Sequence, residues 1–142
     1  MNLGQMILVI LAAILFSTFI IAVFNSMMVQ MENAVVNLYM TQGVKIADQV
    51  LQEYEAKILS HTITFDEVYN TLNGGITKPP VALGGADYIV SIISRPCSTN
   101  GSIVGSLGNH QRIDVMVRIV ADNREYYVGN ETNPFSKVFS RI

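Results

Sequence analysis

The most constraining feature of the sequence is its N-terminal part, which carries no charged side chain from residue 1 to residue 31. Within it lies a run of 22 residues, Leu3 to Phe24, of which 14 are Leu, Ile, Val or Phe. As a helix this run would be about 33 Å long, which matches the hydrocarbon thickness of a bilayer. Those 14 side chains favour insertion by roughly 4–8 kcal/mol in total. The run is therefore expected to form a helix that can span a membrane.

The helix is expected to continue far beyond the apolar run, because the sequence between Gln5 and Leu59 has no proline and only one glycine. Beyond Gln30 the pattern turns amphipathic, with apolar residues at steps of three and four. We predict that this stripe packs on the rest of the chain through Val36, Met40, Gly43, Ala47, Val50 or Leu51, Tyr54 and Ile58. Three segments result: an apolar helix over 1–31, its amphipathic continuation over 32–59, and a head domain over 60–142.

The head is expected to begin with a short helix and to continue as strands. Thr64 and Glu67 fit a capping box, which predicts a helix from Phe65 to about Leu72. Alternation of apolar and polar residues predicts a strand over 112–120 with Ile113, Val115, Val117 and Ile119 on its buried face. Further strands are expected over 87–94 and 125–128, with a hairpin turn over 121–124 and a loop over 97–108.

The last residues fit two kinds of secondary structure. Asn133-Pro134 can start a helical turn with Phe135, Val138, Phe139 and Ile142 on one face, and the same residues also tolerate a strand. We predict a helix. The expected fold class is α+β, in which a long N-terminal helix packs on a small head made of an antiparallel meander.

Composition and charge exclude several classes of function. The net charge of −2 offers no basic surplus for nucleic-acid phosphates, so no nucleic-acid binding is expected. The single cysteine, Cys97, is expected to be a buried thiol, and His61 and His110 have no partners at metal-ligand spacing. No nucleophile lies beside a base, and there is no glycine-rich phosphate loop. We therefore expect neither an enzyme nor a bound metal or cofactor.

The layout resembles the type IV pilin and pseudopilin superfamily. The opening MNLGQMILVILAAI is similar to the mature N-terminus of that family, in which a large apolar first residue is followed at the fifth position by glutamate; here these positions are Met1 and Gln5. The resemblance covers the architecture of the whole chain, but at the level of motifs only about the first twenty residues. It implies a subunit that is held in the inner membrane, processed by a prepilin peptidase and polymerised by pilus assembly machinery.

The sequence departs from the family pattern at two positions. Gln5 can offer a hydrogen bond but not the carboxylate that is thought to meet the N-terminal amine of a neighbouring subunit. The kinking proline of the family is replaced by Ala22, which predicts a straighter helix. Met1 is taken as the mature N-terminus: a leader cut after Gly4 would be short and would lack basic residues. A cleavable secretory signal is disfavoured because no Lys or Arg precedes the apolar run.

The function that follows from this resemblance is a pilin, the structural subunit of an extracellular filament used in adhesion or motility. Two alternatives are a minor pseudopilin of a secretion machine and a monomeric, membrane-anchored binding module. The residues expected in the filament core are Met1, Leu3, Gln5, Ile7, Ile10, Leu11, Ile14, Phe16, Phe19, Ile20 and Phe24. Asn100 and Asn130 match the N-glycosylation acceptor pattern and are possible sites of modification on the head.

Overall fold

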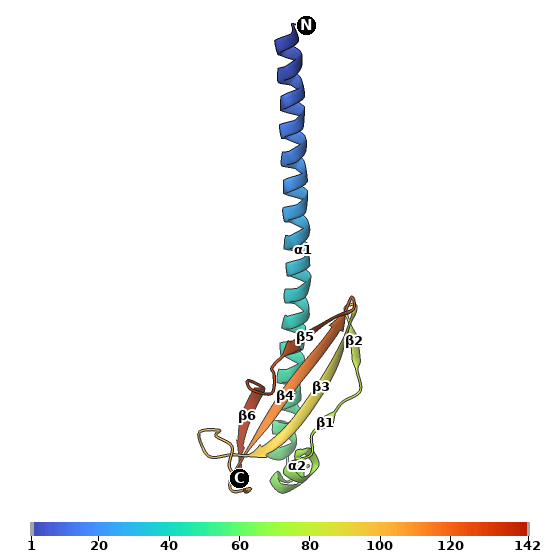
Figure 1. Ribbon diagram of the computed structural model, residues 1–142. Coiled ribbons are helices and arrows are strands. Elements are labelled where there is room, and N and C mark those ends of the chain that lie inside the picture. Colours follow the sequence, from blue (N-terminus) through green and yellow to red (C-terminus); the bar gives the residue numbers. More distant parts are fainter. Residues whose placement is uncertain (1, 142) are drawn as a thin grey trace. The chain divides into compact units, whose positions relative to one another are not determined.

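A computed structural model describes residues 2–141 (Figure 1). The architecture is α+β: a long N-terminal helix, α1 (Leu3–Leu59), packs on a small antiparallel β-sheet, as the sequence predicts. Two compact units divide the chain, one over 1–38 and one over 39–142. The boundary lies inside α1, so the second unit contains the last part of the helix together with the whole sheet.

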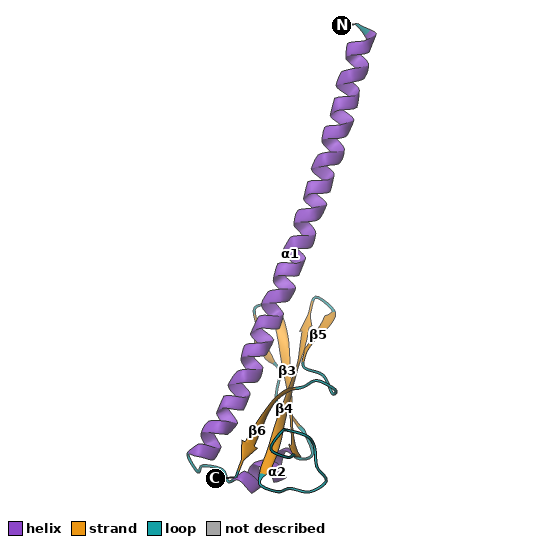
Figure 2. Cartoon of the chain, turned by 90° about the vertical axis from the view of Figure 1, so that its left-hand side faces the viewer, coloured by secondary structure: helices purple, strands orange, loops and turns teal. Residues whose placement is uncertain are grey.

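All strand pairs in the sheet are antiparallel and are organised around two long central strands (Figure 2). The central pair is β3 with β4. Both β1 and β2 pair with the free edge of β3, and both β5 and β6 pair with the free edge of β4. The strand bounds are β1 (Ile76–Thr77), β2 (Val81–Leu83), β3 (Ala86–Pro96), β4 (His110–Ala121), β5 (Arg124–Val128) and β6 (Phe135–Ser140).

One face of the sheet is buried against α1, which confirms the predicted alternation in β4. The buried face of that strand carries Ile113, Val115, Val117 and Ile119, all completely buried. On β3 the residues of the same face include Tyr88, Val90 and Ile92, and the helix contributes Ala47, Leu51 and Ile58 to the same cluster. The hairpin turn between β4 and β5 is also confirmed, since Asp122 and Asn123 both have positive φ, as a tight two-residue turn requires.

The predicted C-terminal helix is wrong, because residues 135–140 form strand β6. Phe135 pairs with Val115 and Ser140 with His110, so the strand runs along the first half of β4. A spacing of four places Phe135 and Phe139 on one face of a helix and equally on one face of a strand. Pairing with β4 makes this segment a strand instead of a helix. The side chain of Phe139 is buried in the core.

The sheet is also not the simple meander that was predicted. Strand β6 returns to β4 instead of pairing with β5, and two short strands, β1 and β2, precede β3. Lys78, Pro79 and Pro80 separate these short strands. The loop predicted over 97–108 is confirmed apart from one isolated bridge between Cys97 and Ile103.

Helix α1 approaches the sheet most closely at Gly43. A Cβ atom placed there would lie 2.8 Å from Val128 Cγ2 and 2.9 Å from Ile119 Cδ1. Both distances are shorter than van der Waals contact between two carbon atoms. Glycine inside a helix costs roughly 0.5–1 kcal/mol relative to alanine. The absence of a side chain is what lets the helix lie this close to β4 and β5.

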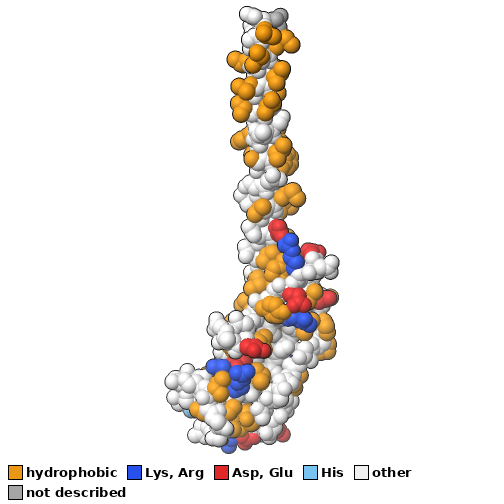
Figure 3. All heavy atoms as spheres, viewed as in Figure 1, with side chains coloured by type: hydrophobic (Ala, Val, Ile, Leu, Met, Phe, Trp, Pro, Cys, Tyr) orange, Lys and Arg blue, Asp and Glu red, His pale blue; other side chains and the backbone are white. Residues whose placement is uncertain are grey.

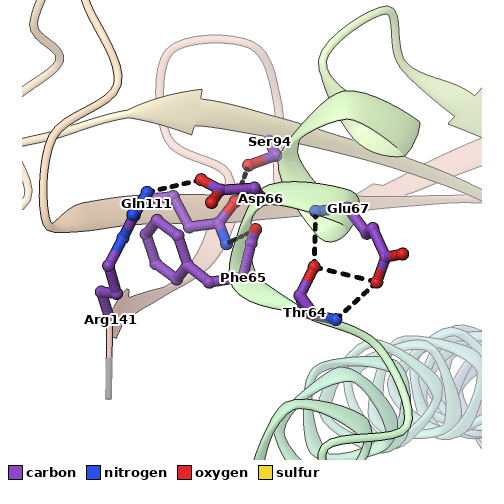
Figure 4. A network of polar contacts seen from close by, with 7 residues as sticks. All are labelled: Thr64, Phe65, Asp66, Glu67, Ser94, Gln111 and Arg141. Atoms are coloured by element: carbon purple, nitrogen blue, oxygen red, sulfur yellow. Dashed lines mark hydrogen bonds and ion pairs between the residues drawn. The ribbon is translucent and has the colours of Figure 1, made fainter.

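The short helix α2 (Phe65–Leu72) begins with the predicted capping box (Figure 4). The backbone N–H of Thr64 donates to Glu67 Oε2 over 2.8 Å, and the backbone N–H of Glu67 donates to Thr64 Oγ1 over 3.3 Å. Two amides at the start of the helix thus gain partners. Hydrogen bonds from Thr64 lower the pKa of the Glu67 carboxyl below its ordinary value.

Acid is expected to remove the contribution of Glu67 to stability. A carboxyl whose pKa is lower in the folded state stabilises the fold above its unfolded pKa, about 4.3, and this contribution is lost as the pH falls through the folded pKa. Glu67→Gln keeps a hydrogen-bond acceptor but does not titrate in this range. The thermal midpoint should therefore decrease more between pH 7 and pH 3 for the wild type than for Glu67→Gln. Equal losses in both proteins would contradict this assignment.

A buried polar network joins α2 to the sheet. The side chain of Gln111 donates from Nε2 to the carbonyl oxygen of Phe65 over 2.9 Å, and it accepts at Oε1 from Ser94 Oγ over 2.8 Å (Figure 4). Gln111 and Ser94 are both completely buried. Because buried polar groups are costly when they lack partners, this network holds the start of α2 at one place beside β3 and β4.

Replacing Gln111 with leucine should destabilise the head by about 2 kcal/mol. The substitution leaves the Phe65 carbonyl and the Ser94 hydroxyl buried without their present partner, and each such group costs about 1–3 kcal/mol. Urea unfolding of the full chain in detergent, followed by near-ultraviolet circular dichroism, measures the change. Gln49→Leu on the exposed face of α1 is the control and should change the free energy of unfolding little. Equal stability of Gln111→Leu and the wild type would refute the role of the network.

Candidate assembly surface

The apolar part of α1 is exposed on all its sides. The nine apolar residues expected in a filament core that fall within the described range are each 37–73% exposed: Leu3, Ile7, Ile10, Leu11, Ile14, Phe16, Phe19, Ile20 and Phe24. Figure 3 shows hydrophobic side chains along this segment, and no residue in it is charged. The helix is long and apolar enough to cross a membrane, and none of its most apolar stretch is buried inside the protein.

Polar groups within the apolar run are satisfied by the helix itself. Ser17 Oγ donates to the carbonyl oxygen of Ala13 over 2.8 Å, and Thr18 Oγ1 donates to that of Leu15 over 2.9 Å. The helix continues through both residues without interruption. In apolar surroundings each backbone and hydroxyl group must find its partner inside the segment. These two hydroxyls meet that requirement, so they do not prevent the helix from lying in lipid or among other apolar helices.

Gln5 makes a hydrogen bond within its own chain. Its Oε1 accepts from the backbone N–H of Asn2 over 3.2 Å, while the carbonyl oxygen of Asn2 accepts from the backbone N–H of Gln5 over 2.8 Å. This is half of a capping box, in which a Gln at the third helical position bonds back to the cap residue. This role of Gln5 was not predicted, although Asn2, three residues before a Gln, is its signal in the sequence. Met1 lies outside the described residues.

The residues predicted to pack the helix on the head differ in burial. Ala47, Leu51 and Ile58 are buried, and Met40 and Tyr54 are half-buried against the core. Val36 is half-buried and belongs to the first compact unit. Gly43, also predicted to lie on this stripe, is buried, and Tyr39 is buried although it was not predicted to be. The helical period allowed either Val50 or Leu51 on the packing stripe. Both are buried in the structure, so both face the core.

The two possible glycosylation sites are exposed asparagines in loops of the head. Oδ1 of Asn100 accepts from the backbone N–H of Ser102 over 3.0 Å. Oδ1 of Asn130 accepts from the backbone N–H and the hydroxyl of Thr132, over 3.0 and 2.8 Å. Both asparagines are reachable from solvent, and whether either is modified stays a prediction.

Of the groups considered for chemistry, Cys97 and His110 are neighbours through their backbones, where the N–H of Cys97 donates to the carbonyl oxygen of His110 over 3.2 Å. Cys97 is buried, as predicted, and burial raises the pKa of its thiol above the ordinary value. His110 Nδ1 lies 2.9 Å from Ser140 Oγ, and His61 is exposed. Within residues 2–141, no three His, Cys, Asp or Glu side chains are grouped so that they could hold a metal ion. The surface that stands out in the described chain is therefore the apolar helix.

Comparison with known proteins adds no relatives: no protein-family model matches the chain, and no curated protein or solved structure matches it significantly.

Proposed function

We propose that this chain is a structural subunit of an extracellular filament of the type IV pilus kind. The observation that carries the proposal is that side chains on all faces of the charge-free helix are apolar and exposed. A helix that pairs with one partner needs a single apolar stripe, whereas a helix that is apolar all round needs apolar surroundings on every side. Either lipid or several neighbouring copies can provide them.

The two surroundings are close in hydrophobic free energy, since lipid tails are about as apolar as leucine. A subunit can therefore be stored in the inner membrane and later transferred to a bundle of identical helices. Subunits that contact each other through different faces form an open helical polymer. In such a filament the helices form the core and the heads form the surface, where they carry adhesion or motility. The resemblance of the N-terminal segment to pilins supports this assignment.

The processing and assembly partners belong to the same proposal. A prepilin peptidase and pilus assembly machinery would supply the work needed to extract the helix from the membrane, because exchanging lipid for apolar helices provides little hydrophobic driving force. The head has a completed core, and no buried side-chain polar atom among its described residues lacks a partner. It can therefore stay folded during the transfer.

Electron microscopy of sheared surface filaments, together with mass spectrometry of their subunits, tests the proposal. Recovery of this chain as the dominant component would support the filament. Its recovery as a trace component beside another subunit would favour a minor pseudopilin. Recovery only from detergent-solubilised membranes would refute the proposal and leave a membrane-anchored module.

A further inference from the structure

We propose that the head binds a small zwitterionic ligand, an α-amino acid or a short peptide, in a groove on the face of the sheet opposite α1. The ligand places its carboxylate on Arg95, its ammonium on Glu131 and an apolar side chain against Met116. This inference does not depend on the proposed filament, because every residue that carries it lies in the head.

The groove lies on the outer face of the central strands β3 and β4. The last part of α1 lies against the other face of the sheet (Figure 2). Two adjoining hollows, of about 400 and 320 Å³, form the groove and share Thr77, Ser91, Met116 and Glu131. Sites for small molecules have volumes of about 300–1,000 Å³ and combine apolar walls with a few polar groups. Each hollow is therefore large enough for a molecule of the size of an amino acid.

One wall of the groove is a turn whose shape is fixed by the chain itself. Asn130 Oδ1 accepts from the backbone N–H groups of Thr132 and Asn133, over 3.0 and 2.6 Å. At Gly129, where φ is 75°, a Cβ would lie 2.9 Å from a backbone nitrogen of β6, so only glycine lets the chain turn so tightly here. Glu131 belongs to this turn and lines both hollows. Its backbone is thus held in place before a ligand arrives.

The smaller hollow has an excess of positive charge on one side. Arg95 lines this hollow, and its side chain is 36% exposed. The carboxylate of Asp114 already accepts two hydrogen bonds from Arg112, over 2.7 and 3.0 Å, whereas Arg95 Nε lies 3.9 Å from it. Within residues 2–141 the Arg95 side chain forms no hydrogen bond. Its guanidinium can therefore donate to both oxygens of a ligand carboxylate.

The negative charge in the same hollow also lacks a partner. Glu131 forms neither an ion pair nor a side-chain hydrogen bond with any other described residue, Arg95 included. A guanidinium and a carboxylate that line one hollow without contacting each other match a molecule that carries both charges. Thr77 Oγ1 and Ser91 Oγ, also in this hollow, lie 3.4 Å apart, so they bond each other only weakly and can bond a ligand. Figure 3 shows acidic and basic side chains close together on this face of the head.

The larger hollow offers a place for an apolar side chain. Ile89 and Met116 line it and are half-buried, and Tyr127 is 53% exposed at its rim. Arg118 bonds Glu125 over 3.2 Å, so the charge at this end is already compensated. An apolar side chain that enters the hollow leaves water, and the flexible Met116 can adapt to its shape. An amino acid such as leucine therefore fits both hollows.

Titration of the full chain with L-leucine, followed by NMR of ¹³C-labelled methionine methyl groups in detergent micelles, tests the inference. Met116 is the only methionine after Met40, and the variant Met116→Leu identifies its signal. That signal should shift with a dissociation constant of about 1 mM or below, while the other methionine signals stay in place. A parallel titration with L-leucyl-L-leucine distinguishes a free amino acid from a short peptide as the source of the same chemistry.

Analogues and matched variants test the two charges separately. Leucinamide lacks the carboxylate and isocaproate lacks the ammonium, and each should bind about tenfold more weakly than leucine or worse. Glu131→Gln should weaken leucine about tenfold but leave isocaproate unchanged, and Arg95→Gln should weaken leucine but leave leucinamide unchanged. Asp122→Asn and Lys45→Gln make the same charge changes at exposed positions outside the groove and should bind leucine like the wild type.

Glu131→Gln keeps the experiment decisive, because Glu131 has no side-chain partner among the described residues and its replacement should leave the fold intact. The inference is overturned if the Met116 signal does not move up to about 10 mM of either ligand. Equal binding of leucine and both analogues would also overturn it, because the groove would then not recognise charge. So would shifts of all methionine signals together, which indicate binding to the micelle or the long helix.

Discussion

Phe16→Asp is expected to abolish filament assembly while leaving the chain in the membrane. An aspartate at the centre of a spanning helix opposes insertion by about 2.5–3.5 kcal/mol, which is less than the roughly 4–8 kcal/mol supplied by the apolar side chains of the run. In a filament core the same carboxylate would be buried among apolar neighbours in every subunit, without a counter-ion. Phe16 is 65% exposed in the single chain, so its replacement disturbs no internal packing. Filament yield, counted by electron microscopy and normalised to membrane-bound protein, measures the effect.

Two companion variants sharpen this experiment. Ile20→Asp, one turn further along the helix, should reproduce the loss, because the whole apolar run is expected to be enclosed. Phe16→Leu keeps the position apolar and should assemble about as well as the wild type. If Phe16→Asp polymerised normally, residue 16 would not be enclosed by apolar neighbours. If Phe16→Asp were absent from the membrane fraction, the loss of filaments would reflect failed insertion. The test would then depend on the filament yield of Ile20→Asp in the same assay.

Gly43→Leu is expected to destabilise the head by roughly 2 kcal/mol or more. Even a Cβ at this position would clash with Val128 and Ile119, and both contacts belong to well-packed strands of the core. Adding a large side chain to a filled core costs typically 1–3 kcal/mol or more, and the gain in helix propensity offsets only about 1 kcal/mol of this. Urea unfolding of the full chain in detergent would report the loss.

Ala56→Leu is the matched control for Gly43→Leu. Ala56 lies on the same helix but is exposed, so a larger side chain there meets no neighbouring strand. Its free energy of unfolding should stay within about 0.5 kcal/mol of the wild type. Similar stabilities for Gly43→Leu and Ala56→Leu would show that the helix does not need to approach β4 and β5 so closely.

Features that depend on neighbours in sequence could be predicted. The length of α1 follows from the absence of proline, the start of α2 from Thr64 and Glu67, and the buried face of β4 from its period of two. Each of these signals is complete within a few residues. The exposed apolar helix is of the same kind, because its missing charges can be read directly from the sequence.

Features that depend on distant partners could not be predicted. Strand β6 is a strand because it pairs with β4, and the spacing of Phe135 and Phe139 alone fits a helix as well. The two-residue strand β1 likewise exists only through its pairing with β3. The sequence shows that Gly43 lies on the buried stripe of the helix, but the closeness of Val128 depends on how the sheet is placed.

A helical reconstruction of the native filament by cryo-electron microscopy tests the central claim most directly. We expect a lipid-free core in which residues 3–31 of many copies of α1 pack against one another, with the antiparallel heads outside. A filament held together by contacts between heads alone, with the apolar helices still embedded in lipid, would contradict it.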